Sequence, residues 1–289
     1  MSRPPVIIIG MHRSGTTMVS QLLQEMGLFI GWKLDENREA KFFSKHNTWL
    51  LDSAGGRWDT PSNIEYLYAD AKGVEMAVRY LKLRMSSPGC YEYFGLARYA
   101  RYRGIFKIAE PWGWKDPRNT LALPLWIRLF PEAKVIHVVR NGIDVADSLL
   151  RRQQAASNAA RDNLQKYGRL FQLRPKRGWF GSSPRVLNRT EGFRLWEEYM
   201  DFAERFTRSL NNPSIEVRYE EFVTDPAPIS AKLASFCGLP SDPERIERFC
   251  STVRRDRSFS FAKDAKSRDL WESVRQTKWM SRYGYSTCD

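Results

Sequence analysis

The clearest pattern near the amino terminus is an apolar run that ends at a glycine. Residues 5–10, PVIIIG, are continuous and rich in β-branched side chains. Such a run is typical of a strand buried on both faces of a parallel sheet. After a short polar stretch the apolar residues recur at helical spacing until Gly27, at Met18, Val19, Leu22, Leu23 and Met26. The pattern predicts a strand, a glycine-containing loop and a helix in that order.

Two further units repeat the order of strand and helix. A strand over residues 134–139 is followed by a turn at Asn141–Gly142 and by a helix through Val145, Leu149 and Leu150. A third strand is predicted in SIEVRYEEF, residues 214–222, before the helical pattern PAPISAKLASFCGL. Strands that alternate with helices predict an α/β fold, with a central parallel sheet flanked by helices. We expect a single domain over residues 1–289.

Residues 151–192 interrupt this alternation. They hold ten Lys and Arg residues against two acidic ones, Asp162 and Glu191. Within them RPKRGWFGSSPR has the glycine, proline and serine content of a loop. One interpretation is a solvated basic insertion, and the other is a lid or acceptor-binding segment within the domain. The sequence leaves both open.

The composition indicates that the protein has an anionic partner. The 289 residues carry a net charge of +13, and their 42% hydrophobic content excludes a disordered chain. A polyphosphorylated cofactor, an acidic acceptor, nucleic acid or a membrane surface would fit the charge. Nucleic acid is disfavoured, because no basic surface motif is interleaved with aromatic residues.

The cysteines and the amino terminus indicate the compartment. The four cysteines lie far apart, without a CxxC pair or a cysteine–histidine cluster, so we expect free thiols and no metal site. The first apolar run is too short for a signal peptide or a membrane span. The sequence thus predicts a cytoplasmic protein without a transmembrane segment.

The loop GMHRSGTT, residues 10–17, carries the strongest chemical signal. A glycine turn between a buried strand and a helix gathers backbone N–H groups at the positive end of the helix dipole, which favours anions. Gly10, Gly15 and Thr17 match the nucleotide loop GxxxxGK[ST], but Thr16 replaces its lysine. The second strand also ends in Arg140 rather than in a magnesium-binding aspartate. A P-loop small-molecule or nucleotide kinase therefore remains only as the alternative function.

Several motifs resemble sulfotransferases that use 3′-phosphoadenosine 5′-phosphosulfate (PAPS). GMHRSGTT resembles the family's 5′-phosphosulfate loop, and VVRNGIDVADSL is similar to its 3′-phosphate motif. WKDPR, RLFPEAKVIHVVR, EVRYEEFVTDP and WMSRYGY follow in the family's order, so the resemblance spans most of residues 5–285. It implies a P-loop NTPase-like fold and these PAPS-binding residues: Arg13, Ser14, Gly15, Thr16, Thr17, Arg140 and Ser148.

The resemblance also implies a reaction. The family transfers the sulfuryl group of PAPS to an acceptor hydroxyl or amine by in-line displacement, leaves 3′,5′-ADP (PAP) and needs no metal. Positioning, charge stabilisation and a general base then provide the catalysis. Lys115, in GWKDPR, resembles the lysine that contacts the sulfuryl group and the leaving oxygen. Arg118 is a candidate for binding an anionic acceptor, or else part of a structural ion pair.

The general base is predicted from the segment LDENREAKFFSKHN, which offers Asp35, Glu36 and Glu39. Tyrosylprotein members carry a Glu-Glu-Thr-Arg run, and DENR is the nearest match, which ranks Glu36 first. The NPxGFWE run of bacterial members instead aligns Ser44 with the family glutamate. His46 lies close to it and titrates near neutrality, so it ranks second. An exposed polar turn is the other interpretation. The charge favours an anionic or amphipathic acceptor: a small molecule, a glycan or a lipid.

Overall fold

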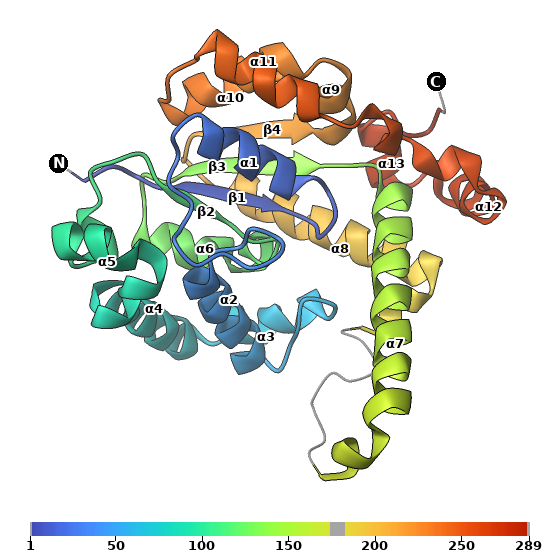
Figure 1. Ribbon diagram of the computed structural model, residues 1–289, viewed down its shortest axis with the longest axis horizontal. Coiled ribbons are helices and arrows are strands. Elements are labelled where there is room, and N and C mark those ends of the chain that lie inside the picture. Colours follow the sequence, from blue (N-terminus) through green and yellow to red (C-terminus); the bar gives the residue numbers. More distant parts are fainter. Residues whose placement is uncertain (1, 174–182, 288–289) are drawn as a thin grey trace. The chain divides into compact units, whose positions relative to one another are not determined.

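The computed structural model describes residues 2–173 and 183–287. Within them a four-stranded sheet has the order β2-β1-β3-β4, and every neighbouring pair is parallel. Helices lie on both sides of this sheet (Figure 1). The predicted α/β class, with a central parallel sheet flanked by helices, is confirmed. The strands are β1 (Val6–Gly10), β2 (Gly113–Lys115), β3 (Lys134–Val139) and β4 (Ser214–Arg218).

The two central strands have the burial that their apolar runs predict. All five residues of β1 are buried, and so are five of the six residues of β3. Ile8 lies opposite Ile136 in the register, and Gly10 lies opposite Val138. Because side chains alternate between the faces of a strand, each apolar residue of these strands packs against one helical layer or the other.

The edge strands differ from the sequence-based expectation. β2 was not predicted, because three residues are too few to show an alternating or continuous apolar pattern. It pairs with β1 so that Ile8 lies opposite Lys115. The predicted third strand is too long by four residues, since β4 ends at Arg218 and Tyr219 begins a helix.

One face of the sheet is covered by one helix that follows β1 and by three helices that follow β4. They are α1 (Thr16–Glu25), α9 (Tyr219–Thr224), α10 (Pro226–Cys237) and α11 (Pro243–Thr252). Val6, Ile8 and Val138 pack there with apolar residues of these helices, such as Leu22 and Leu233. Burial of apolar side chains contributes about 25 cal/mol per Å², so this layer is a main source of stability.

The helices that follow α1 in the chain supply a second, aromatic core. In this core Phe43 of α2 stacks on Trp114 of β2 with ring centroids 4.0 Å apart, and Trp126 of α6 meets Trp114 edge-on at 5.2 Å. These contacts fix β2 at the sheet edge through its middle residue. The helices are α2 (Lys41–Ser53), α3 (Ile64–Ala69), α4 (Ala71–Ser86), α5 (Tyr91–Tyr102) and α6 (Asn119–Leu129).

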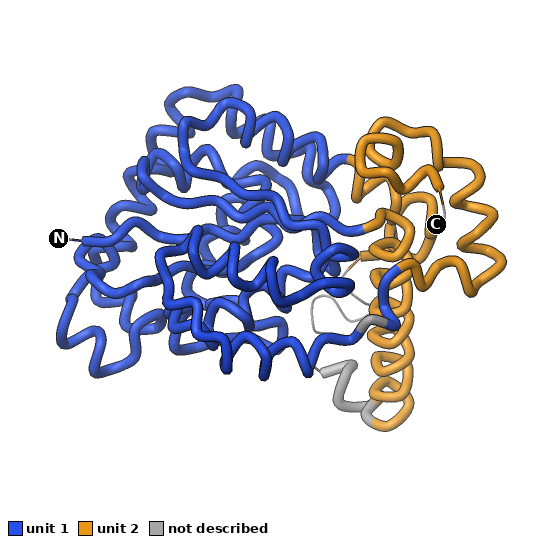
Figure 2. Tube along the Cα trace, turned by 90° about the horizontal axis from the view of Figure 1, so that it is seen from above, with its two compact units in different colours: residues 1–140, 198–258 blue, residues 141–197, 259–289 orange. Residues whose placement is uncertain are grey.

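Contacts divide the chain into two compact units, residues 1–140 with 198–258 and residues 141–197 with 259–289 (Figure 2). The sheet belongs to the first unit. The second unit contains α7 (Gly142–Leu173), α12 (Ala265–Val274) and α13 (Lys278–Arg282), while α8 (Arg189–Arg208) contributes to both. Asp147 of α7 accepts hydrogen bonds from Arg189 at 2.7 Å and Ser267 at 2.6 Å, which ties α7 to α12.

The basic segment begins as a helix. Residues 151–173 continue α7, because their Ala, Gln and Arg residues favour a helix and no proline interrupts them. The following residues 174–182, which carry most of the predicted loop, lie outside the described residues. The lid therefore stays a prediction. No helix in residues 2–173 or 183–287 combines the length and the apolar character that crossing a bilayer requires.

Candidate functional site

The candidate site lies at the carboxyl edge of the sheet. Gly10 ends β1, Lys115 ends β2, and Arg140 directly follows β3. Because the strands are parallel, these ends meet at one edge, where open α/β sheets bind their ligands. Three strand ends that are far apart in the sequence thus lie at the edge of the sheet where the loop between β1 and α1 begins.

The loop between β1 and α1 depends on two glycines. Gly10 has a φ of 139° and Gly15 a φ of 96°. Residues other than glycine rarely adopt such positive values. A Cβ on Gly10 would lie 2.5 Å from the backbone oxygen of Val138, and one on Gly15 would overlap the ring of Tyr219. Between them Arg13 has a φ of 70°. The loop conformation therefore requires glycine at both ends.

The start of α1 is open toward this loop. Gly15 precedes the helix, and no side chain caps it. The first N–H groups of a helix have no partner inside it, so those of α1 point into the loop. Ser14 donates to the backbone oxygen of Met11 at 2.7 Å, and its hydroxyl thereby shapes the turn. Thr16 is buried, and the side chain of Arg13 is exposed.

A side chain of α6 forms hydrogen bonds with the first residue of this loop. The hydroxyl of Thr120 accepts a hydrogen bond from the N–H of Gly10 at 2.9 Å and donates to its carbonyl at 3.3 Å. Thr120 is fully buried. This pair of bonds satisfies both backbone groups of Gly10 at the end of β1.

Arg140 joins three parts of the first unit. Its guanidinium donates to the backbone oxygens of Arg13 at 3.2 Å and Arg257 at 2.6 Å. It also lies over the ring of Tyr219, 4.5 Å from the centroid, so Tyr219 has Gly15 and Arg140 as neighbours. The predicted 3′-phosphate arginine therefore contacts the backbone of the predicted 5′-phosphosulfate loop. Ser148 lies on α7 in the second unit and is partly buried.

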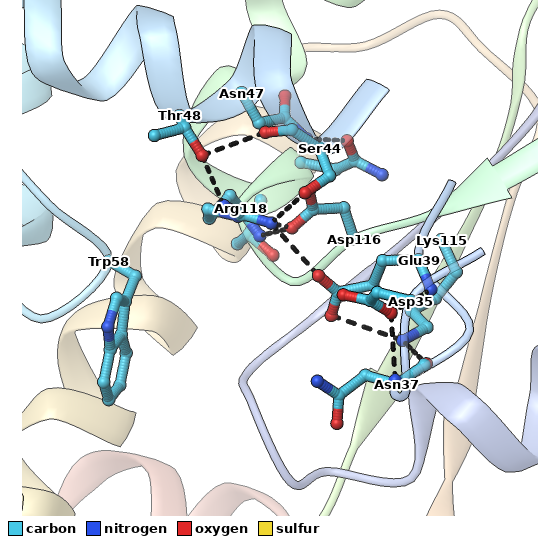
Figure 3. Close-up of polar contacts among 12 residues, drawn as sticks. Asp35, Asn37, Glu39, Ser44, Asn47, Thr48, Trp58, Lys115, Asp116 and Arg118 are labelled. Atoms are coloured by element: carbon cyan, nitrogen blue, oxygen red, sulfur yellow. Dashed lines mark hydrogen bonds and ion pairs between the residues drawn. The ribbon is translucent and has the colours of Figure 1, made fainter. Parts of the chain in front are cut away.

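Lys115 lies in a buried network of charged side chains (Figure 3). Its side chain is 1% exposed and forms an ion pair with Glu39, Nζ to Oε1 3.3 Å. The other oxygen of Glu39 accepts from Arg118 Nη2 at 3.0 Å. Arg118 also donates from Nε to Asp116 at 2.8 Å. We call Glu39, Lys115, Asp116 and Arg118 the charged cluster.

The environment of Glu39 moves its pKa toward neutrality. Burial is the largest cause and Asp116 the next, and together they raise the pKa of Glu39 to about 7 although Lys115 and Arg118 lower it. Burial lowers the pKa of Lys115, and Glu39 partly opposes that shift. A carboxyl group with a pKa near the working pH can accept a proton from a substrate and release it afterwards.

Arg118 is fully engaged in this arrangement. Besides Asp116 and Glu39, it donates to Thr48 Oγ1 at 2.6 Å and to Ser44 Oγ at 2.9 Å. Each nitrogen of its guanidinium therefore has a protein partner. Of the two interpretations of Arg118 from the sequence, the geometry favours the structural ion pair, and the residue that it fixes is Glu39.

The turn before Glu39 connects the charged cluster to α1. Asp35 accepts from the backbone N–H groups of Asn37 at 2.9 Å and Glu39 at 2.8 Å, which folds residues 35–39 into a tight turn. The backbone oxygen of Asn37 then accepts from Lys115 and, at 3.2 Å, from Thr17. The backbone oxygen of Asn37 is therefore a hydrogen-bond acceptor shared by the predicted PAPS-binding loop, through Thr17, and by the predicted catalytic lysine, Lys115.

The two residues ranked as the general base lie elsewhere. Glu36 is exposed at the tip of this turn. His46 is buried in α2, where its Nδ1 lies 2.6 Å from the carbonyl of Phe42, and burial lowers its pKa. Its charged neighbours Arg84, Glu92 and Lys45 lie outside the charged cluster. The structure brings Glu39, and neither Glu36 nor His46, together with Lys115.

An aromatic group flanks the loop on another side. The ring of Trp58 meets the ring of His12 edge-on at 4.7 Å, and its backbone oxygen accepts from Tyr199 Oη at 2.9 Å. His12 thus packs against the rings of Trp58 and Tyr199. Burial raises the pKa of Tyr199 well above its usual range, which the charge of Arg118 partly opposes.

Comparisons with known proteins give the family of this chain. Residues 4–243 match the Sulfotransferase family, and the chain belongs to this family. An uncharacterized protein of Aquifex aeolicus (strain VF5) is 25% identical over 254 residues, 88% of this chain. The chain spans 28% of the length of that curated relative.

The solved structures that are similar to this chain include sulfotransferases. A sulfotransferase from Alicyclobacillus acidocaldarius has a TM-score of 0.45 and 17% identity, with 84% of this chain and 83% of that one covered. The sulfotransferase domain from the curacin biosynthetic pathway has a TM-score of 0.47 and 14% identity, with 99% of this chain and 98% of that one covered.

In residues 2–173 and 183–287, no group of His, Cys, Asp and Glu side chains could hold a metal ion.

Proposed function

We propose that this chain transfers the sulfuryl group of PAPS to an acceptor hydroxyl or amine, with Glu39 as the general base. The observation that carries the proposal is the meeting of three features at one sheet edge. These are the glycine loop with its open helix start, Arg140, and the buried pair of Lys115 and Glu39.

The donor half of the site fits a phosphosulfate. Uncapped N–H groups at the start of α1 suit an anion, and the hydroxyl of Thr16 adds a donor beside them. In this proposal residues 13–17 hold the 5′-phosphosulfate and Arg140 holds the 3′-phosphate, for which the resemblance of the motif also implies Ser148. When bound, PAPS supplies a sulfuryl group whose bond to the 5′-phosphate oxygen breaks as a bond to the acceptor forms.

The remaining chemistry belongs to the charged cluster. Glu39 takes the proton of the acceptor hydroxyl, for which its pKa of about 7 is well matched. Lys115 places a buried positive charge where negative charge develops on the leaving oxygen. Arg118 positions Glu39 through its Nη2 and is itself held by Asp116, Ser44 and Thr48.

Thermal stabilisation tests the donor assignment. We expect PAP to raise the melting temperature of the protein, because a ligand that binds only the folded state stabilises it. ATP with magnesium should have little effect, since the loop carries Thr16 in the position of the kinase lysine. Stabilisation by ATP with magnesium but not by PAP would replace this proposal with the kinase alternative.

A further inference from the structure

The acceptor side of the site carries an inference about the substrate, which rests on the proposed function. The high net charge predicts an anionic acceptor, but the charges of the buried cluster around Glu39 are paired with one another. The side chains joined by hydrogen bonds there include the carboxyl groups of Glu39 and Asp116 and the cations of Lys115 and Arg118. Asp35, which folds the adjoining turn, adds a third carboxyl group.

Both cations, Lys115 and Arg118, already form ion pairs with carboxyl groups of the protein. Lys115 contacts Glu39 and the carbonyl of Asn37, and Arg118 contacts two carboxyl groups and two hydroxyls. Asp116 Oδ2 is buried and has no hydrogen-bond partner within residues 2–173 and 183–287. An anionic acceptor would meet more carboxyl groups than uncommitted cations, and like charges in a buried site are costly.

Two uncharged groups are placed to recognise an acceptor instead. The side-chain amide of Asn37 makes no hydrogen bond to any described residue, and in Figure 3 it points away from Lys115, toward the side on which Trp58 lies. Trp58 is partly exposed, and its contact with His12 keeps it beside the glycine loop. The hydroxyl of Tyr199 donates to the backbone oxygen of Trp58 at 2.9 Å, which holds this segment in place.

An aromatic ring together with an amide favours a particular kind of molecule. A sugar ring presents C–H groups on its face, which pack on an indole, and hydroxyl groups around its edge, which pair with an amide and with carboxyl oxygens. A simple phenol offers the face but lacks the ring of edge hydroxyls. A lipid would leave the amide and the carboxyl groups unpaired.

We propose that Trp58 and the side-chain amide of Asn37 bind a neutral sugar ring as the acceptor, with the hydroxyl to be sulfated beside Glu39. Trp58 then acts as an acceptor-binding residue, and Asn37 has two roles: its carbonyl positions Lys115 and its amide contacts the acceptor. The new bond joins the sugar oxygen to sulfur, and the hydroxyl proton passes to Glu39.

Matched acceptors test the charge preference. With PAPS as donor and release of PAP as the readout, methyl glucopyranoside should be used at least tenfold better, in kcat/KM, than methyl glucuronopyranoside. The two probes share the ring and its secondary hydroxyls and differ at C6, where the glucoside has a hydroxymethyl group and the glucuronide a carboxylate. 2-Naphthol, which has an aromatic face but no edge hydroxyls, should also be a poorer acceptor than the glucoside. Preference for the glucuronide or for 2-naphthol would overturn the proposal.

Variants test the two named residues. Trp58→Ala should raise the KM for methyl glucopyranoside about tenfold, and Asn37→Ala, which keeps the backbone carbonyl, should raise it several-fold. Trp58→Phe keeps a flat ring and should retain most of the activity, which separates stacking from a loss of folding. The affinity for PAP should be unchanged in all three variants. An unaltered KM in both alanine variants would contradict the proposal.

The two proposals fail in different ways. If PAP binds and sulfuryl transfer proceeds to another acceptor better than to the glucoside, only the acceptor class is wrong. If PAP does not stabilise the protein and PAPS is not consumed with any of the three probes, the proposed function is wrong and the acceptor proposal with it.

Discussion

The two halves of the candidate site are built in different ways. The glycine loop is one continuous stretch, and its conformation depends on backbone angles at Gly10 and Gly15 and on N–H groups of α1. The charged cluster is assembled from side chains of separate segments, with Glu39 before α2 and Lys115 at the end of β2. The glycine loop can therefore be predicted from a short sequence motif, whereas the charged cluster forms only when the chain folds.

This difference predicts separate effects on donor binding and on turnover. Changes in the charged cluster should lower kcat and leave the affinity for PAP intact. Changes in the loop and at Arg140 should lower the affinity for PAP. A variant of the cluster that lost PAP binding to the same extent as activity would remove the distinction between the two halves.

The largest effect is expected for Glu39→Gln. The amide keeps the shape of the side chain but cannot accept the acceptor's proton, so kcat should fall by about 10²–10⁴-fold. Steady-state kinetics with PAPS and calorimetric titration with PAP measure the two properties. Glu36→Gln is the matched control, since Glu36 is exposed three residues earlier and should retain activity. A larger loss for Glu36→Gln than for Glu39→Gln would restore the ranking made from the sequence.

Lys115→Ala should lower kcat by about 10²–10³-fold, because it removes the buried positive charge beside the leaving group. The exposed Lys41, at the start of α2, provides a control substitution to alanine that should change little. The same kinetic assay and PAP titration apply. Full activity of the Lys115 variant would exclude this lysine from the mechanism.

Arg140→Ala should weaken PAP binding about ten- to a hundredfold, as expected when a charged hydrogen bond to a phosphate is lost. Adenosine 5′-monophosphate lacks the 3′-phosphate, so its affinity should change less than that of PAP. Calorimetric titration with both ligands separates a lost phosphate contact from a general distortion of the loop. Equal losses for the two ligands would show that Arg140 acts only through its bonds to the loop backbone.

The smallest of these effects concerns pH. In the wild-type protein kcat/KM should rise as the pH rises through about 7, because Glu39 must lose its proton to act as a base. Arg118 lowers the pKa of Glu39, so Arg118→Ala should move this rising limb upward by about one pH unit. A pH profile of kcat/KM measures the shift. A limb that stays in place, or moves downward, would mean that another group titrates there.

The sequence predicts the centre of the sheet better than its edges, for a physical reason. β1 and β3 are buried on both faces, so their apolar runs are long and distinct. β2 is three residues long and is kept in place by Phe43 and Trp126, which come from other segments. The start of α9 at Tyr219 also escapes the pattern, because a strand that turns directly into a helix offers no break in polarity.

The same contrast holds within the site. The motif around Gly10 and Gly15 is local, and the structure gives it the strand, loop and helix that it predicts. The choice among Asp35, Glu36 and Glu39 depends on which side chain is buried beside Lys115, a residue in a distant segment. One signal was present in the sequence: Asp35 at the start of the segment favours a turn, which would use its carboxyl group and turn the chain before Glu39.

The packing of Tyr219 against Gly15 has an evolutionary consequence. Any side chain at position 15 would overlap the Tyr219 ring, so the two positions cannot change independently. Because the positive φ of Gly15 also favours glycine, we expect homologues to keep glycine at position 15 wherever an aromatic residue aligns with Tyr219. In this chain, the destabilisation caused by Gly15→Ala should be partly relieved by Tyr219→Leu, and a double-mutant cycle in urea would measure that coupling.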